Sequence, residues 1–206
     1  MTPSPSILGG TPPIPVSLTF RESPILGLVP EWMELRQELS QLFECRLLLR
    51  STDHAIDTES LLGEHVQLGL PEQPFLPVVH GIVRSVHQLS AEPTGVSRYE
   101  LSIVPPLWLT TQRRDHRIFQ HLTVPEIVAS VMAGYGGVLS APVVRTGPRA
   151  AREYTVQYGE TDHDFVFRLL ADDGITSFFD HEAGGAFTLI DDTTRLEASV
   201  SDAIPF

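Results

Sequence analysis

The chain has 206 residues, 42% of them apolar, and a mean hydropathy of +0.03, which excludes disorder of the whole chain and predicts one or two folded domains. Its 26 acidic and 14 basic residues give a formal charge of −12, which argues against nucleic acid or an anionic membrane as a partner. The single cysteine, Cys45, excludes an intrachain disulfide and favours folding in the reducing cytoplasm. We expect neither a membrane-spanning helix nor a secretory signal peptide, since no stretch has the required apolar run.

The first half of the chain predicts many short strands. Residues 1–15 are rich in Pro, Ser and Gly and are expected to form a flexible leader. Residues 16–109 form the first expected module, in which residues 43–51, 66–70, 81–89 and 99–103 alternate like strands. Several short strands separated by Pro and Gly are typical of a β-sandwich or β-barrel.

The second expected module, residues 110–206, begins with a helix. Thr123 and Glu126 form a capping-box pattern, and Pro125 occupies the first turn. Apolar residues follow at helical spacing up to Tyr135, and a glycine cluster from Gly134 is expected to end the helix rather than to bind phosphate.

A strand, a turn and a second helix are predicted between residues 152 and 175. The alternation at residues 152–158 is that of a half-buried strand, which we expect to end at Gly159. Thr161 caps the helix, and Asp162 and Asp164 lie near the positive end of its dipole. Gly174 is expected to end the helix in a left-handed conformation, before a hairpin at residues 176–181 and 186–191. The apolar stripe of this helix consists of Phe165, Val166, Leu169 and Leu170.

Three ordered motifs together resemble the hub region of VgrG proteins, the spikes of type VI secretion. They are HGIV at residues 80–83 after Leu62-Gly63, then PPLWL, RIFQ and PEIV at residues 105–128 after Tyr99, and finally YTVQYGETDHDFVFRLLADDGI at residues 154–175. The residues that match the family's motifs, and to which the resemblance assigns structural roles, are Gly81, Trp108, Arg117, Phe119, Glu126, Tyr154, Gln157, Tyr158, Glu160, Asp162, Phe165, Arg168, Leu169 and Gly174.

The resemblance implies a mainly β fold with short helices (α+β), made of two β-barrel-like modules of the phage tail hub type. It implies a structural protein with no catalytic, cofactor-binding or metal-binding residues. The implied partners are two further copies in a homotrimer, a hexameric Hcp-type tube ring and other baseplate proteins. Such a protein would be cytoplasmic before firing and then be delivered to a target cell by the contractile machine.

The family continues into an OB-like module and a β-helix needle, often followed by an effector or a PAAR-type tip, and this sequence shows no such parts. Whether the first module is complete without later strands stays open. One alternative function is the hub of a contractile phage tail or tailocin baseplate. Another, from a different class, is a hydrolase that uses carboxylate and histidine side chains near Asp162 or His181.

Individual polar clusters are expected to be structural. The Asp162-His163-Asp164 run could be a metal cluster, but adjacent residues on a helix point in different directions, which favours a helix start. His181 could act in acid–base chemistry, although its predicted position at a hairpin turn favours a solvated residue. The basic run at residues 113–117 could hold an anion or a partner's carboxylate, yet such runs are more often solvated loops. Cys45, Trp108 and Phe119 are expected to be core residues.

Overall fold

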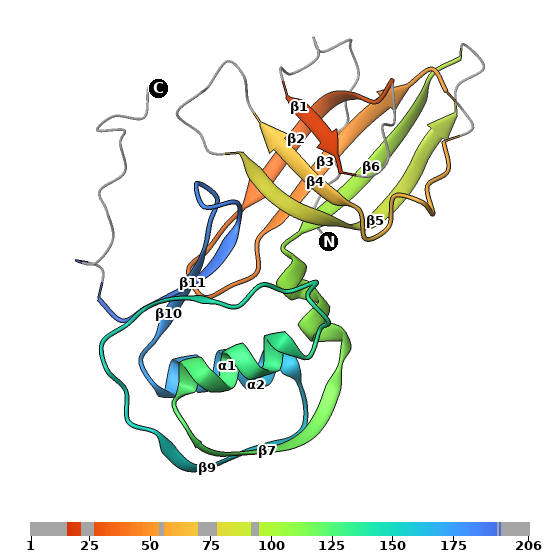
Figure 1. Cartoon of the computed structure of the whole chain (residues 1–206). Coiled ribbons are helices and arrows are strands. Elements are labelled where there is room, and N and C mark those ends of the chain that lie inside the picture. The colour runs from red at the N-terminus through yellow and green to blue at the C-terminus, as the bar shows by residue number, and fades with distance from the viewer. Residues whose placement is uncertain are drawn as a thin grey trace, which may run out of the picture.

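The structure is a computed structural model that describes residues 16–21, 27–53, 56–69, 78–91, 95–192 and 194. The expected flexible leader at residues 1–15 lies outside the described residues. The fold is mainly β with short helices, as predicted, and its elements form two groups that follow each other along the chain (Figure 1).

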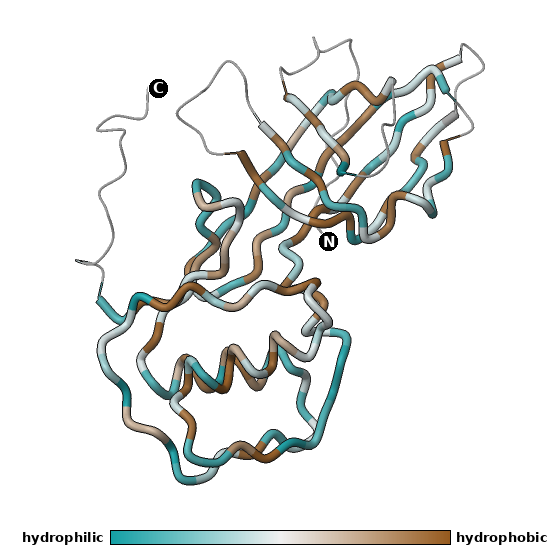
Figure 2. Tube along the Cα trace, in the orientation of Figure 1, coloured by the Kyte–Doolittle hydropathy of each residue, from teal (hydrophilic) through white to brown (hydrophobic). Residues whose placement is uncertain are grey.

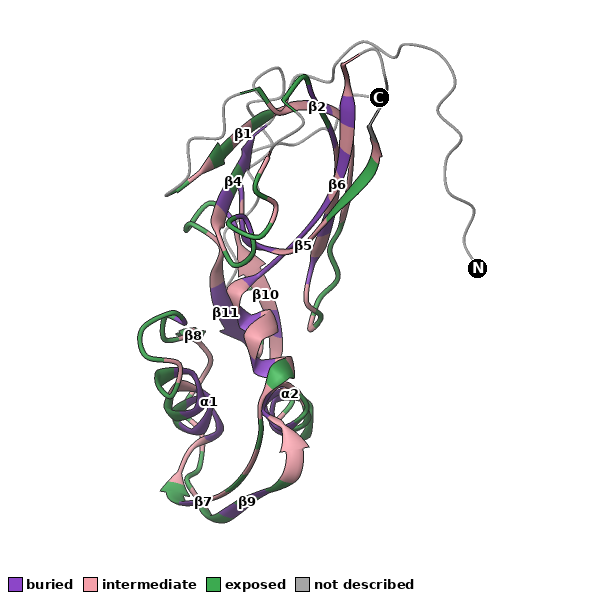
Figure 3. Ribbon diagram, turned by 90° about the vertical axis from the view of Figure 1, so that its right-hand side faces the viewer, coloured by how far each residue is buried: buried purple, intermediate pink, exposed green. Residues whose placement is uncertain are grey.

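The first group is one antiparallel sheet of six strands in the order β1-β4-β5-β6-β3-β2. The sheet curls round on itself, as Figure 3 shows from the side. Its strands are β1 (Ser17–Phe20), β2 (Val29–Arg36), β3 (Glu44–Ser51), β4 (His65–Gly69), β5 (Val79–Ala91) and β6 (Ser97–Val104).

The core of this sheet follows the predicted alternation. Every second residue of residues 43–49 is buried, as are Tyr99, Leu101 and Ile103 on the neighbouring strand. Gly81 lies where β5 runs close beside β6: a Cβ there would come within 2.6 Å of a methyl group of Ile103. Leu70, expected in the strand after Leu68, lies outside the described residues.

The second group contains two helices, a 3₁₀ helix and two small sheets. Strands β7 and β9 pair antiparallel, while β10, β11 and β8 form a three-stranded sheet in which β8 runs parallel to β11. Apolar residues recur along both helices in Figure 2. The elements are η1 (Pro106–Gln112), β7 (Arg114–Leu122), α1 (Val124–Ala133), β8 (Val143–Arg145), β9 (Arg152–Thr161), α2 (Asp162–Asp172), β10 (Thr176–Asp180) and β11 (Ala186–Ile190).

The predicted helix boundaries are confirmed by their caps. Thr123 accepts a hydrogen bond from the backbone of Glu126, whose carboxylate accepts one from the backbone of Thr123 at 2.8 Å. At the start of α2, the Thr161 hydroxyl accepts from the backbone N–H of Asp164 at 3.0 Å. Gly174 has the left-handed φ of +66° expected after α2.

Strand β9 differs from the prediction in two ways. It does not end at Gly159, which adopts a φ of +65° within the strand, opposite a register irregularity in β7. The strand is half-buried, but its inward face is the polar one: Gln157 is fully buried, whereas Tyr158 is 82% exposed. The hydrogen bonds of Gln157, and not the burial of apolar side chains, therefore determine which face of β9 points inward.

The β10–β11 hairpin lies between the six-stranded sheet and the helices (Figure 3). Phe179 packs against the cores of both groups, and its ring meets that of Phe43 edge-on at 5.3 Å. The backbone N–H of Ser40 donates to the carbonyl of Ser177 at 2.7 Å. The segment that follows β2 therefore runs beside β10 and joins the two groups.

Candidate functional site

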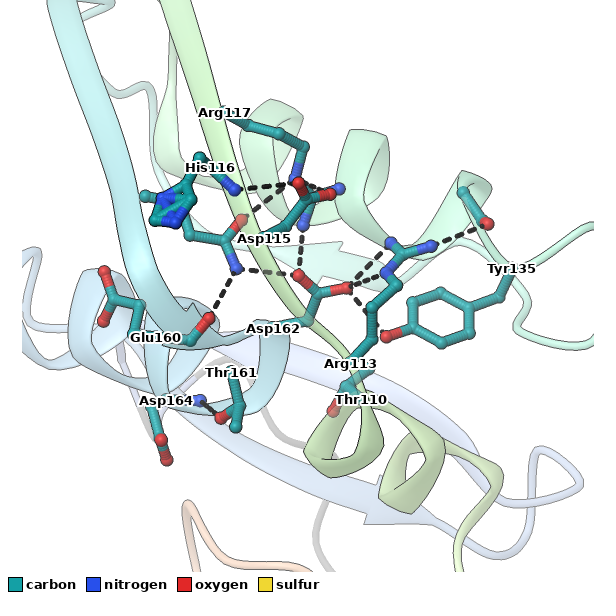
Figure 4. A network of polar contacts seen from close by, with 12 residues as sticks. Thr110, Arg113, Asp115, His116, Arg117, Tyr135, Glu160, Thr161, Asp162 and Asp164 are labelled. Atoms are coloured by element: carbon teal, nitrogen blue, oxygen red, sulfur yellow. Dashed lines mark hydrogen bonds and ion pairs between the residues drawn. The ribbon is translucent and has the colours of Figure 1, made fainter.

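The densest polar cluster surrounds Asp162, the first residue of α2, whose side chain has no exposed surface (Figure 4). Arg113 donates to its Oδ2 through Nε at 2.7 Å, and Arg117 donates to Oδ1. The hydroxyl of Tyr135 donates to Oδ2 at 2.7 Å, and Nε2 of Gln157 donates to Oδ1 at 2.8 Å. The cluster thus connects β7, the loop after α1, β9 and α2.

These donors hold the Asp162 carboxylate in its charged form. Burial alone would raise its pKa, but the hydrogen bonds from Gln157 and Tyr135 and the charge of Arg117 outweigh burial and lower the pKa. Both oxygens accept at least two hydrogen bonds, so few lone pairs remain for a substrate or an ion. A carboxylate saturated in this way fixes elements in place and is poorly suited to proton transfer.

The basic run at residues 113–117 is not a solvated loop, and that expectation is wrong. Arg113 is the C-cap residue of η1, residues 114–117 form the beginning of β7, and both Arg113 and Arg117 point at Asp162. The guanidinium of Arg113 also lies 4.2 Å from the ring centre of Tyr135. Two of its basic residues therefore hold a carboxylate of the same chain, because burying Asp162 requires opposite charge beside it.

The structure brings five of the fourteen motif residues to this cluster or its edge: Arg117, Gln157, Glu160, Asp162 and Arg168. Arg117 Nε donates to Gln157 Oε1 at 2.9 Å, and Gln157 Nε2 also donates to the carbonyl of Glu160 at 3.1 Å. Arg168 forms a two-pronged ion pair with Glu160.

The other motif residues lie outside this cluster, in the core, at helix ends or on the surface. Phe119 and Phe165 stack at 5.5 Å inside the core, and Leu169 is buried there as well. Trp108 is half-buried in η1, while Tyr154 and Tyr158 face solvent. Glu126 caps α1, and Gly81 and Gly174 lie outside the cluster, in β5 and after α2.

His181 is buried, so the expectation of a solvated turn residue is wrong for it, whereas Glu182 is exposed. Its Nε2 forms a hydrogen bond with the Gln37 amide, and its ring lies edge-on to Phe43 at 5.1 Å. Burial, and then the charge of His80, lower the pKa of His181. The turn closes against the six-stranded sheet and so removes this ring from water.

Within the described ranges, no group of three or more His, Cys, Asp or Glu side chains is placed to hold a metal ion. Asp162, His163 and Asp164 in particular diverge, since Asp164 is exposed while Asp162 is turned inward. None of the helices in the described part of the chain has both the length and the apolar character needed to cross a membrane.

Sequence reasoning overlooked Arg113, Tyr135 and Gln37 as partners of Asp162 and His181. The one available signal was the pair of arginines four positions apart, which a β-strand places on one face. Nothing in local spacing indicates that this face meets a helix start 45 residues later.

A curled β-sheet followed by a helix-containing module, with a polar cluster that joins its elements, is the architecture of a mainly β structural protein. The family model described as "Phage tail baseplate hub (GPD)" matches residues 36–206, and the chain belongs to this family.

Two spike proteins of Pseudomonas aeruginosa are similar in sequence. The type VI secretion system spike protein VgrG4b is 40% identical over 146 residues, which cover 70% of this chain and 18% of that protein. For VgrG1a the identity is 37% over 157 residues, covering 75% of this chain and 24% of that protein. The chain therefore spans about a fifth of the length of these relatives.

Solved structures show the same fold. The Escherichia coli c3393 protein, a type VI secretion component described as similar to the bacteriophage T4 tail proteins gp27 and gp5, superposes with a TM-score of 0.78 at 29% identity. The match covers 88% of this chain and 51% of that chain. A 43 kDa tail protein of prophage MuSo2 from Shewanella oneidensis shares the fold alone, with a TM-score of 0.59 at 12% identity over 84% of this chain and 52% of that chain.

Proposed function

We propose that this chain is the hub region of a VgrG-like spike in a type VI secretion machine. In this role it caps the secretion tube and is expelled with it when the sheath contracts. The observation that carries the proposal is its 40% identity to a spike protein over 70% of the chain, joined to a hub fold. The proposed role requires no catalysis, and the internal hydrogen bonds that occupy the Asp162 carboxylate support a structural function for this cluster.

The proposed assembly is a homotrimer that meets a hexameric Hcp-type tube ring. The resemblance to VgrG hubs implies two related barrel modules in each chain, so three chains would present six comparable surfaces to a sixfold ring. The expected division between residues 109 and 110 falls inside η1, the 3₁₀ helix that follows the six-stranded sheet, which ends at Val104. An effector or PAAR-type tip would attach through parts of a longer polypeptide.

The alternative is a hub of a contractile phage tail or tailocin. The description of the matching family as a phage tail baseplate hub favours this alternative, whereas the prophage tail protein, at 12% identity, shares only the architecture. The hydrolase alternative has weaker support. Hydrogen-bond donors already occupy both oxygens of Asp162, and His181 is buried at the hairpin turn, with only 7% of its surface exposed.

Deletion of the gene in its bacterium, followed by measurement of tube protein released into the medium, tests the proposal. We expect release to stop and to return when the gene is restored. A restored gene that carries Asp162→Ala should not rescue release if the variant is unfolded, whereas Asp172→Asn, at an exposed position, is the matched control that should rescue. Unchanged release in the deletion strain would refute the role in secretion.

A further inference from the structure

The outward face of the β7–β9 ribbon is apolar and unusually exposed for a strand pair. Ile118 is 61% exposed, Tyr154 54% and Tyr158 82%, and Val156 lies between the two tyrosines. The strand register places Ile118 opposite Val156, so the four side chains form one continuous surface. Contiguous exposed apolar surface of this kind marks an interaction site more often than scattered single residues do.

Two further residues complete this outer face at one end. The ring of His116 lies edge-on to that of Tyr158 at 5.0 Å, and Arg114 donates to the carbonyl of Gly159 at 2.9 Å. The outward positions of the ribbon (114, 116, 118, 120, 154, 156 and 158) include no acidic residue, in a chain with 26 of them. The outer face therefore combines apolar side chains with a basic edge and favours a partner with carboxylates beside an apolar group.

A second surface of the same chain has the complementary chemistry. Leu39 is 65% exposed and follows the exposed Glu38, in the segment that runs beside β10. The hydrogen bond between Gln37 and His181 brings this segment to the hairpin turn, where Glu182 is exposed. We call Glu38, Leu39 and Glu182 the acidic corner.

We propose that the outer face of the β7–β9 ribbon binds the acidic corner of a second copy of this chain. The inference rests on the trimer of the proposed function and names its contact surfaces. The two surfaces lie on different elements, with β7 and β9 at one end of the second group and the hairpin turn toward the six-stranded sheet (Figure 1). A contact between two different surfaces can close into a threefold ring, whereas a surface that pairs with itself gives a twofold dimer.

Charge also favours the contact between different surfaces. Arg114 would meet Glu182 or Glu38 of the neighbour, whereas pairing of two outer faces would bring the basic edges together without any carboxylate. Tyr158 and Ile118 would bury Leu39, which otherwise stays in water.

Charge reversal and rescue in the full chain test the proposal, with self-association measured by sedimentation from micromolar to near-millimolar concentration. We expect Arg114→Glu and Glu182→Arg each to weaken association about tenfold, because each places like charges together. The double variant Arg114→Glu/Glu182→Arg should regain the association of the unchanged chain. Arg50→Glu, which reverses an exposed arginine near the far end of β3 from the acidic corner, is the control and should change association little.

Three results would overturn the proposal: no association of the unchanged chain at near-millimolar concentration, association insensitive to both single reversals, or a double variant weaker than either single variant. Tighter association of Arg114→Glu with the unchanged chain than of the unchanged chain with itself would indicate face-to-face pairing and would also overturn it. If both single variants associate as tightly as the unchanged chain while deletion of the gene still stops tube release, the named contact fails and the hub function stands. Loss of release on gene deletion tests that function independently.

Discussion

Arg117 of β7 and Asp162 of α2 lie 45 positions apart in the chain and meet as an ion pair in which the carboxylate is fully buried. Removing one partner of a buried pair leaves the other charge uncompensated, which is far more costly than losing an exposed pair. The stability of the second group therefore depends on a contact between distant parts of the sequence.

We expect Asp162→Asn to lower the free energy of unfolding by ~3–5 kcal/mol, since Arg113 and Arg117 would lose their shared anion. Urea unfolding measures the change. Asp172→Asn removes an exposed carboxylate 3.9 Å from Arg168 and should cost less than about 0.5 kcal/mol. Equal losses of unfolding free energy in the two variants would show that the buried Asp162 cluster stabilises the fold no more than an exposed ion pair does.

The same carboxylate predicts a loss of stability in acid. Its pKa is lower in the folded protein, so its contribution is complete above the unfolded pKa of about 4 and is lost as the pH falls through the folded value. Unfolding midpoints of the unchanged chain and of Asp162→Asn should therefore converge below about pH 4. A constant difference between them down to low pH would contradict this prediction.

His181 predicts a second pH dependence, at higher pH. Because burial lowers its pKa, stability is complete above the unfolded pKa of about 6.5 and falls as the pH drops through the lower folded value. We expect the midpoint of the unchanged chain to fall between about pH 7 and about pH 5 by more than that of His181→Gln. Replacement of the half-buried His163 in α2 is the control and should leave this difference intact.

Leu169→Ala should cost ~2–5 kcal/mol, because this side chain is fully buried in the core that both helices share. Leu62 is 53% exposed, and Leu62→Ala should change the free energy of unfolding by less than about 0.5 kcal/mol. A denaturation midpoint that Leu169→Ala leaves unchanged would mean that the stripe of α2 does not face the core.

Gly174→Val should destabilise the chain through its backbone alone. An added Cβ at Gly174 meets no atom within 4 Å, but the φ of +66° is unfavourable for a β-branched residue by at least ~1–2 kcal/mol. Gly174→Asn is the control, since Asn adopts this conformation more readily. Thermal unfolding of the two variants separates backbone strain from lost packing, and equal melting temperatures would argue against strain.

The sequence predicted those elements whose buried side is apolar. This rule holds for residues 43–49 and for the helices α1 and α2. The N-terminal caps of the two helices are also recognisable in the sequence, because the two residues of each cap lie three positions apart. Strand β9 does not follow the rule, because alternation defines two faces without indicating which one is buried. The partners that turn Gln157 inward come from β7 and α2, and such long-range contacts leave no trace in local spacing.

The hydrogen bond between Ser40 and Ser177 also constrains the order in which the chain can fold during synthesis. Strands β2 to β6 leave the ribosome long before β10, yet the rings of Phe43 and His181 cover each other only once the hairpin arrives. Part of the apolar surface of the first sheet, including the ring of Phe43, therefore stays exposed until nearly all of the described chain has been synthesised. Nascent chains that stop within α2 should consequently be held by chaperones, whereas those that extend past β11 should be released.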